Sequence, residues 1–171
     1  MDLTLVEREN VLLGTEFLTW LWFITENEQS MFEDKKGQAV GFYLDGKMVV
    51  KGGEGLAVSS ASVTNPTGSL PEALTGLREG KKVYECMLVF DQDGDEWKMK
   101  VKGETMSLTG IKTPKVVVED DDDLDAAFLE KMFLIERVLE FFDTLFNKFL
   151  AVRLDSAAWR EEAAKIKVWI S

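Results

Sequence analysis

Apolar residues recur at spacings of three and four in two stretches of the chain, one near each end. In the first stretch, residues 10–27, this spacing predicts an amphipathic helix. The residues that keep the spacing are Leu13, Phe17, Trp20, Leu21 and Ile24. Trp22 and Phe23 widen the apolar face beyond one stripe, so we expect this helix to be covered on more than one side. Its tryptophans are therefore predicted to pack in a core or a subunit seam rather than to stack on bases.

The second stretch, residues 124–154, predicts the longest helix of the chain. One apolar stripe alternates spacings of four and three, and a second apolar set lies beside it. The stripe is Phe128, Met132, Ile135, Leu139, Phe142, Phe146 and Phe149, and the second set is Leu134, Val138, Phe141 and Leu145. Because the polar side is narrow, we expect this helix to be mostly enclosed, either by its own sheet or by a partner chain. A last short helix follows, capped by Asp155 or Ser156.

Between these helices the pattern changes to short alternating runs, which are typical of β-strands. Asp45-Gly46 predicts a hairpin, because both residue types tolerate a positive φ. Asp93-Gly94 predicts a second tight turn, between strands at residues 81–90 and 96–103. We therefore expect one α+β domain over residues 1–171. Its antiparallel sheet would have about five to six strands, packed by a long C-terminal helix and an N-terminal aromatic helix.

The net charge of −11 is unevenly placed along the chain. Residues 1–34 hold eight acids and one base, residues 35–115 hold ten acids and twelve bases, and residues 116–171 hold thirteen acids and seven bases. Nucleic-acid-binding proteins are usually basic, so a strongly acidic chain argues against this function, although a local basic patch can still bind phosphates. No segment approaches the roughly 18–20 apolar residues that span a bilayer, so we expect no membrane contact. The single cysteine, Cys86, suits a reducing cytoplasm.

The residue types give little sign of catalysis or metal binding. Histidine is absent, which removes Ser-His and Cys-His nucleophile pairs and histidine zinc sites. The acids of residues 91–95 have the spacing of a calcium loop, but Glu96 and Lys102 stand where that loop needs Gly and Glu. The acids of residues 119–125 come at a helix start, where they complement the helix dipole. We predict no catalytic residue, no metal and no cofactor.

Lysines alternate with apolar residues along the strand predicted at residues 96–103. The candidates for phosphate contact are Lys98, Lys100, Lys102, Lys47, Lys51, Lys81 and Lys82. On a strand the first three point to one face, and Lys47 and Lys51 repeat this alternation on the earlier hairpin. If those strands are neighbours, one face of the sheet is a basic stripe able to contact phosphates. The alternative is the ordinary solvated face of an antiparallel sheet.

Several segments, taken in order, resemble the C-terminal half of the recombination-associated RdgC family. They are LGTEFLTWLWF, GFYLDGKMVVKGGEG, LPEALTGLREGKKVYECMLVFDQDGDEWKMKVKG and DLDAAFLEKMFLIERVLEFFDTLFNKFL. The resemblance implies a non-catalytic bacterial protein that binds duplex DNA with little sequence preference and limits the access of the recombinase. It also implies a ring-shaped homodimer with a positively lined hole. The chain lacks the counterpart of the family's N-terminal half, so we do not expect it to build the whole ring.

Two functions therefore stand as expectations. The first is a non-enzymatic, cytoplasmic, RdgC-like role in DNA recombination or replication, with duplex DNA as partner, a homo-oligomeric state and a possible protein partner in recombination. The alternative is an acidic protein-interaction or self-association module that does not bind DNA. A duplex gel shift that weakens with salt separates the two, because contacts to phosphates release counterions.

Overall fold

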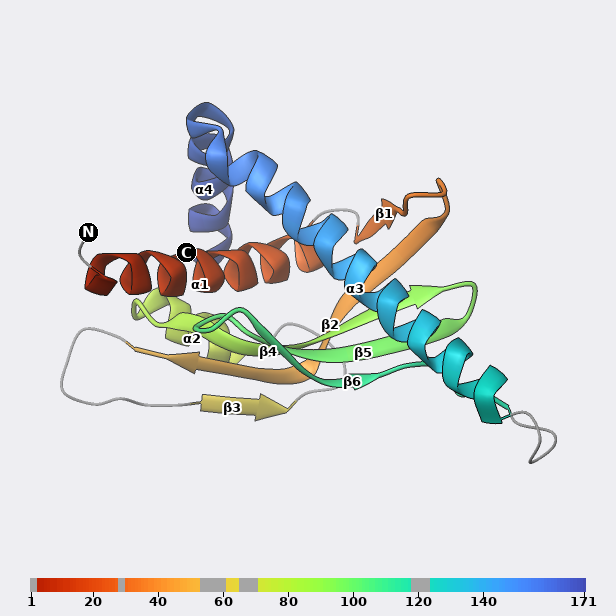
Figure 1. Cartoon of the computed structure of the whole chain (residues 1–171). Coiled ribbons are helices and arrows are strands. Elements are labelled where there is room, and N and C mark those ends of the chain that lie inside the picture. Colours follow the sequence, from red (N-terminus) through yellow and green to blue (C-terminus); the bar gives the residue numbers. More distant parts are fainter. Residues whose placement is uncertain (1–2, 28–29, 53–60, 65–70, 118–123) are drawn as a thin grey trace.

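The computed structural model describes residues 3–27, 30–52, 61–64, 71–117 and 124–171, shown in Figure 1. The helices are α1 (Leu3–Asn27), α2 (Pro71–Arg78), α3 (Leu124–Leu154) and α4 (Ser156–Ile170). The strands are β1 (Met31–Glu33), β2 (Ala39–Lys51), β3 (Ala61–Thr64), β4 (Lys82–Gln92), β5 (Asp95–Lys102) and β6 (Ser107–Lys112). The strands form one antiparallel sheet, and α1 and α3 lie across the same face of it. The predicted α+β fold class is confirmed.

The sheet has the order β1-β2-β4-β5-β6, with β3 paired to β2 as well. β2 is one continuous strand of 13 residues, so the hairpin predicted at Asp45-Gly46 is wrong. Asp45 pairs with Met87 and Met48 pairs with Cys86, which makes the intervening Gly46 and Lys47 extra residues on β2. The Asp-Gly pair is therefore used as a bulge, which bends a strand without reversing it.

The tight turn predicted at Asp93-Gly94 is confirmed. β4 ends at Gln92 and β5 begins at Asp95, which leaves a two-residue connection. Both turn residues have a positive φ, 55° for Asp93 and 90° for Gly94, as a type I′ hairpin requires. This turn sets the register between β4 and β5, and so fixes which side chains of β5 share a face with which side chains of β4.

α3 has its predicted bounds, and α1 ends where predicted but begins earlier. α3 covers residues 124–154 as expected, and Asp155 caps α4 by accepting from the backbone N–H groups of Ala157 and Ala158. α1 begins at Leu3 rather than near residue 10. Of the acids predicted to lie at the start of α3, Asp125 is in the first helical turn, and residues 119–123 lie outside the described residues.

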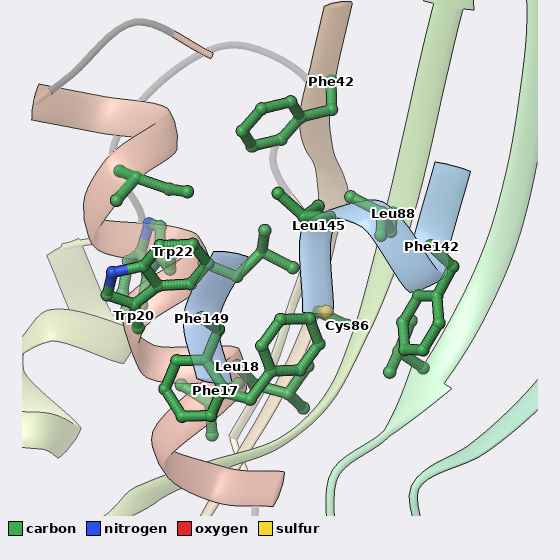
Figure 2. Packing of buried hydrophobic residues seen from close by; sticks show 14 of the residues in the cluster. Phe17, Leu18, Trp20, Trp22, Phe42, Cys86, Leu88, Phe142, Leu145 and Phe149 are labelled. Carbon is green, nitrogen blue, oxygen red and sulfur yellow. The ribbon is translucent and has the colours of Figure 1, made fainter. Parts of the chain in front are cut away.

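The core lies between the sheet and the two helices that cross it. Phe17 of α1 is fully buried and contacts three aromatic rings of α3, with ring centroids 5.8 Å away for Phe142, 5.0 Å for Phe146 and 5.3 Å for Phe149. Figure 2 shows Phe17 among the buried residues, with Phe142 and Phe149. Trp20 is buried beside them, so the prediction of a packed aromatic helix is confirmed. Such aromatic pairs add roughly 0.5–1.5 kcal/mol each beyond the area they bury.

Each buried tryptophan of α1 has a partner for its indole N–H. Trp20 Nε1 donates to Glu162 Oε1 of α4 at 3.1 Å, and Trp22 Nε1 donates to Glu26 Oε1 at 2.7 Å. Trp169 of α4 donates to the other oxygen of Glu26 at 3.2 Å. Because a buried N–H without a partner is costly, these carboxylates fix where α4 packs on α1.

The backbone of α1 packs directly against the backbone at the end of β5. Gly14 in the middle of α1 faces Gly103, which follows β5, and a Cβ added at Gly14 would lie 1.8 Å from the carbonyl oxygen of Gly103. No side chain fits at that distance. The glycine that weakens the helix by propensity is thus the residue that lets the helix reach the sheet.

Candidate functional site

The face of the sheet away from α1 and α3, here called the open face, carries the lysines of β5. Lys98, Lys100 and Lys102 alternate with three buried apolar residues, so the prediction that they share one face is confirmed. The open face includes Tyr43, Asp45, Val49 and Lys51 on β2, Glu85, Met87, Val89 and Asp91 on β4, Glu96, Lys98, Lys100 and Lys102 on β5, and Ser107, Thr109 and Lys112 on β6.

Carboxylates on the same face contact two of the three lysines. Lys100 Nζ lies 3.1 Å from Glu85 Oε1. Lys98 Nζ lies 3.7 Å from Glu96 Oε2 and 3.9 Å from Asp45 Oδ2. These pairs are partly solvated, so each contributes at most about 1 kcal/mol to stability. Their consequence is electrostatic, because each carboxylate cancels a positive charge that a phosphate would otherwise meet.

The prediction of one basic stripe across neighbouring strands is therefore wrong. That prediction was conditional on the strand of Lys47 and Lys51 lying next to β5, and this condition is not met, because β4 lies between β2 and β5. β4 places Glu85 directly opposite Lys102 and Asp91 opposite Glu96. The open face is consequently a mixture of acids and bases, as on the solvated side of an ordinary antiparallel sheet.

The remaining candidate lysines are dispersed. Lys51 lies on the open face with its Nζ 5.6 Å from the ring centroid of Tyr84, and it lines a shallow depression together with Lys102. The backbone of Lys47 pairs with Thr64, and its side chain lies outside the described residues. Lys81 and Lys82 line a different cleft, formed by α1, α2 and α4. The structure thus groups Lys51 with the lysines of β5. Lys82 pairs with Lys51 in the register of β2 and β4 and also lines the second cleft, whereas Lys81 is grouped only with that cleft.

A second surface is formed by the first half of α3, residues 124–139, here called the α3 arm. Six large apolar side chains of this arm are exposed. Their exposed fractions are 63% for Leu124, 64% for Phe128, 67% for Leu129, 49% for Met132, 53% for Phe133 and 39% for Leu139. In Figure 1 the first turns of α3 project beyond the strands. We predicted that this helix would be mostly enclosed, either by its own sheet or by a partner chain. The second half of the stripe is largely buried, and among the described residues nothing covers these six side chains of the first half.

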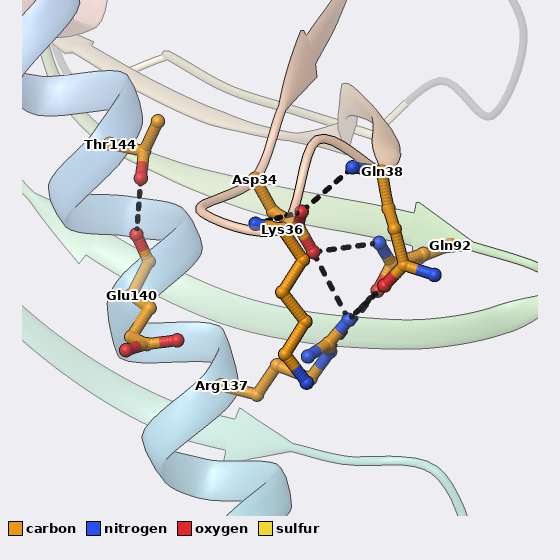
Figure 3. A network of polar contacts seen from close by, with 7 residues as sticks. All are labelled: Asp34, Lys36, Gln38, Gln92, Arg137, Glu140 and Thr144. Atoms are coloured by element: carbon orange, nitrogen blue, oxygen red, sulfur yellow. Dashed lines mark hydrogen bonds and ion pairs between the residues drawn. The ribbon is translucent and has the colours of Figure 1, made fainter.

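Two contacts mark where the exposed arm meets the buried half of α3. Trp97 Nε1 of β5 donates to the backbone oxygen of Leu134 at 3.0 Å. One turn further, Arg137 reaches Asp34 in the β1–β2 connection, with its Nη2 3.2 Å from Asp34 Oδ2, and also donates to Gln92 Oε1 at the end of β4 (Figure 3). These contacts hold α3 to the sheet from residue 134 onward. The preceding turns have a polar contact from Lys131 Nζ to Thr113 Oγ1, just after β6, and their large apolar side chains stay exposed.

The carboxylate of Asp34 is the centre of that polar network. The backbone N–H of Gln38 donates to Asp34 Oδ1 at 2.9 Å, and Gln92 Nε2 donates to Asp34 Oδ2 at 3.2 Å. The hydrogen bond from Gln38, with smaller contributions from Gln92 and Arg137, lowers the pKa of Asp34 below its ordinary value. Hydrogen bonds to a charged carboxylate favour its ionised form, so Asp34 stays charged and paired under mildly acidic conditions.

Two perturbed groups elsewhere have structural explanations. Burial raises the pKa of the Cys86 thiol to about 12, which makes the thiolate scarce and the cysteine unreactive. Burial and the hydrogen bond that its hydroxyl donates to Glu96 raise the pKa of Tyr43 to about 12. Within the described residues no group of three or more acids or cysteines is arranged to hold a metal ion.

No helix among the described residues combines the length and the apolarity needed to cross a bilayer. No protein-family model, curated protein or solved structure matches this chain. The resemblance to the RdgC family therefore stays a prediction.

Proposed function

We propose that this chain is a non-catalytic protein-interaction module that self-associates through the α3 arm. The observation that carries this function is the exposure of six large apolar side chains on one contiguous stretch of helix. Taking roughly 150–250 Å² for a large side chain, their exposed parts amount to roughly 600 Å². Apolar patches of several hundred Å² on a soluble protein mark interaction surfaces.

The spacing of the stripe indicates that its partner is a helix. Phe128, Met132, Ile135 and Leu139 continue the alternation of fours and threes that leads into Phe142. A repeat of 3.5 residues is the seam along which two helices pack. The second half of this seam is covered by α1 of the same chain, through Phe17. The first half needs a second helix in the same manner, and the described residues supply none.

A second copy of this chain is the occupant that the flanking charges favour. With Phe128 and Ile135 at d positions and Met132 at an a position, Lys131 occupies a g position and Glu136 an e position. In a parallel pair of helices, a g residue of one chain meets the e residue five positions on in the other. Two symmetry-related Lys131–Glu136 pairs would then flank the apolar seam, as closed twofold assemblies require.

Sedimentation velocity over a range of protein concentrations tests this proposal. In this register Phe133 is at a b position, outside the seam, so the expected interface is smaller than roughly 600 Å² per partner. An interface of that size is weak, so the wild type should show a concentration-dependent monomer–dimer equilibrium. The double substitution Phe128→Ser/Met132→Ser should be monomeric throughout, because it removes two side chains from the centre of the seam.

The matched control is Leu154→Ser/Val168→Ser, which also removes two exposed apolar side chains but lies outside the arm. This control should dimerise as the wild type does. A wild type that is monomeric at every concentration contradicts the proposal, and so does a control variant that loses dimerisation to the same extent as the arm variant.

Duplex DNA binding is the second candidate function. The lysines of the open face that have no ion pair are the ones at which it is best tested. Among the described residues, Lys51 and Lys102 have no carboxylate within ion-pair distance, whereas Lys98 and Lys100 do. If the open face binds phosphates in the cytoplasm, Lys51→Glu/Lys102→Glu should abolish a duplex gel shift more completely than Lys98→Glu/Lys100→Glu. Equal effects, or the absence of a shift at low salt, would remove this candidate.

A further inference from the structure

A cleft of about 590 Å³ lies between α1, α2 and α4, away from the α3 arm. It adjoins the open face at Lys82, which pairs with Lys51 in the register of β2 and β4. Its floor is apolar and is made by Leu77 of α2 with Trp159, Ile166 and Ile170 of α4. Leu77 and Ile166 are each 8% exposed, so the floor is part of the folded core rather than a loose surface. The cleft is open to solvent and not enclosed.

The rim of this cleft is cationic in a chain whose net charge is −11. Four basic side chains and one acidic side chain line it. The basic ones are Arg78, Lys81, Lys82 and Lys167, and the acidic one is Glu16. Glu16 is already neutralised by Arg153, whose Nε lies 2.6 Å from Glu16 Oε2.

Most of the positive charge at the rim has no carboxylate partner among the described residues. Lys81 pairs with Glu79 at 3.0 Å. Arg78 donates through Nε to the backbone oxygen of Ile170 at 2.7 Å, which positions its guanidinium at the end of α4 without neutralising it. Arg78, Lys82 and Lys167 show no ion pair in the described part of the chain. This differs from the open face, where carboxylates contact Lys98 and Lys100.

We propose that this cleft binds an acidic peptide segment that carries an apolar anchor side chain. Charge complementarity selects the acidic character, because carboxylates would meet Arg78, Lys82 and Lys167 at the rim. The apolar floor selects a Leu- or Phe-sized anchor. Small-molecule ligands are usually 70–90% or more buried in their pockets, so an open cleft fits a passing stretch of chain better than a small ligand.

Fluorescence anisotropy with a labelled synthetic peptide tests the proposal on the full-length protein. The probe is EDDDDLDAAFLE, the sequence of residues 119–130, because it combines seven carboxylates with Leu and Phe. We expect saturable binding that weakens as salt is raised from low to high concentration. The same peptide with every Asp and Glu replaced by Asn and Gln should bind at least tenfold more weakly.

The variant Lys82→Glu/Lys167→Glu should weaken binding of the probe at least tenfold. Both side chains project into solvent at the rim, so the fold should be retained. The control is Lys36→Glu/Lys115→Glu, which makes the same change in net charge at exposed positions elsewhere and should bind as the wild type does. Equal losses in the two variants would overturn the proposal, because only the overall charge would then matter.

Two further measurements keep this test separate from that of self-association. The variant Phe128→Ser/Met132→Ser, which disrupts the α3 arm, should bind the peptide as the wild type does. If this variant fails to bind the peptide, the peptide binds to the arm and not in the cleft. Ile170→Ala alters the floor without changing any charge and should weaken binding severalfold. Unchanged binding in Ile170→Ala, or no saturable binding by the wild type at low salt, would also overturn the proposal.

Discussion

The two halves of α3 have the same apolar stripe and opposite environments. In the second half, Phe142 and Phe149 are buried against Phe17 of α1. In the first half, Phe128 and Met132 continue the stripe and are 64% and 49% exposed. The difference arises from where the other elements end. The aromatic contacts of α1 are with the second half, and Trp97 of the sheet meets α3 at Leu134. Before that point Lys131 makes a polar contact with Thr113, which covers none of the apolar stripe. A helical stripe therefore indicates that something covers it, and the tertiary structure determines what.

The largest expected effect is that of truncating the buried half. Phe149→Ala removes a fully buried ring that contacts Phe17, Trp20 and Trp159. Phe→Ala substitutions in cores cost roughly 3–5 kcal/mol, because the transfer free energy is lost and a cavity remains. Urea denaturation followed by circular dichroism should show this loss in the free energy of unfolding. A loss below about 1 kcal/mol would mean that the second half is not the packed core described here.

The next effect concerns how α1 comes to cover that half. Gly14→Ala puts a methyl group against the backbone of Gly103, where a Cβ would lie 1.8 Å from a carbonyl oxygen. The helix must shift, and overpacking of this kind typically costs roughly 1–3 kcal/mol although Ala is the better helix former. Thermal denaturation should show a lower midpoint than the wild type. A higher midpoint would mean that helix propensity outweighs this contact.

A smaller effect should appear at the junction between the halves, where Asp34 holds Arg137. The pKa of Asp34 is lowered in the folded state, first by the hydrogen bond from Gln38, so the folded protein binds that proton less readily than the unfolded chain. Its stabilising contribution is therefore complete above the ordinary carboxyl pKa of 3.8 and is lost as the pH falls through the lowered folded value. Unfolding free energies measured between pH 5 and about pH 2 should fall less steeply for Asp34→Asn than for the wild type. Identical slopes would contradict the pairing.

The smallest effect on stability is expected in the exposed half. Phe128→Ala makes the same substitution as Phe149→Ala on the same stripe, but its ring is mostly in solvent in the monomer. Substitutions at such surface positions usually change stability by less than about 0.5 kcal/mol. Denaturation of the dilute, monomeric protein should show this near-neutrality. A loss comparable to that of Phe149→Ala would mean that Phe128 packs within its own chain.

The sequence predicted the fold better than the surfaces. The periodicity of residues 124–154 and the turn at Asp93-Gly94 are local signals, and both are confirmed. Asp45-Gly46 carries the same local signal, yet pairing with β4 on one side and β3 on the other keeps β2 continuous. The preference of an Asp-Gly dipeptide for a turn is overridden when the flanking residues are stabilised more by pairing along one continuous strand.

The charges on each surface could not be predicted, because they depend on which strands are neighbours in the sheet. The pattern of residues along the chain does not give the order of the strands. The alternation of Lys98, Lys100 and Lys102 correctly gave their shared face. It did not show that β4 would place Glu85 beside Lys100. The cationic cleft was missed for the same reason, because Arg78 and Lys167 are remote in sequence and meet only through the packing of α2 against α4. Of the four basic residues at the rim, only Lys81 and Lys82 were candidates from the sequence, as lysines near the start of a predicted strand.

Hydrogen exchange measured at low and at high protein concentration tests the central claim most directly, because it locates an interface without altering the chain. If the α3 arm pairs with a second copy, amides of residues 124–139 should exchange more slowly at high concentration, while those of β4 and β5 keep their rates. Exchange in the arm that does not depend on concentration, or protection that grows on the open face instead, would contradict the account.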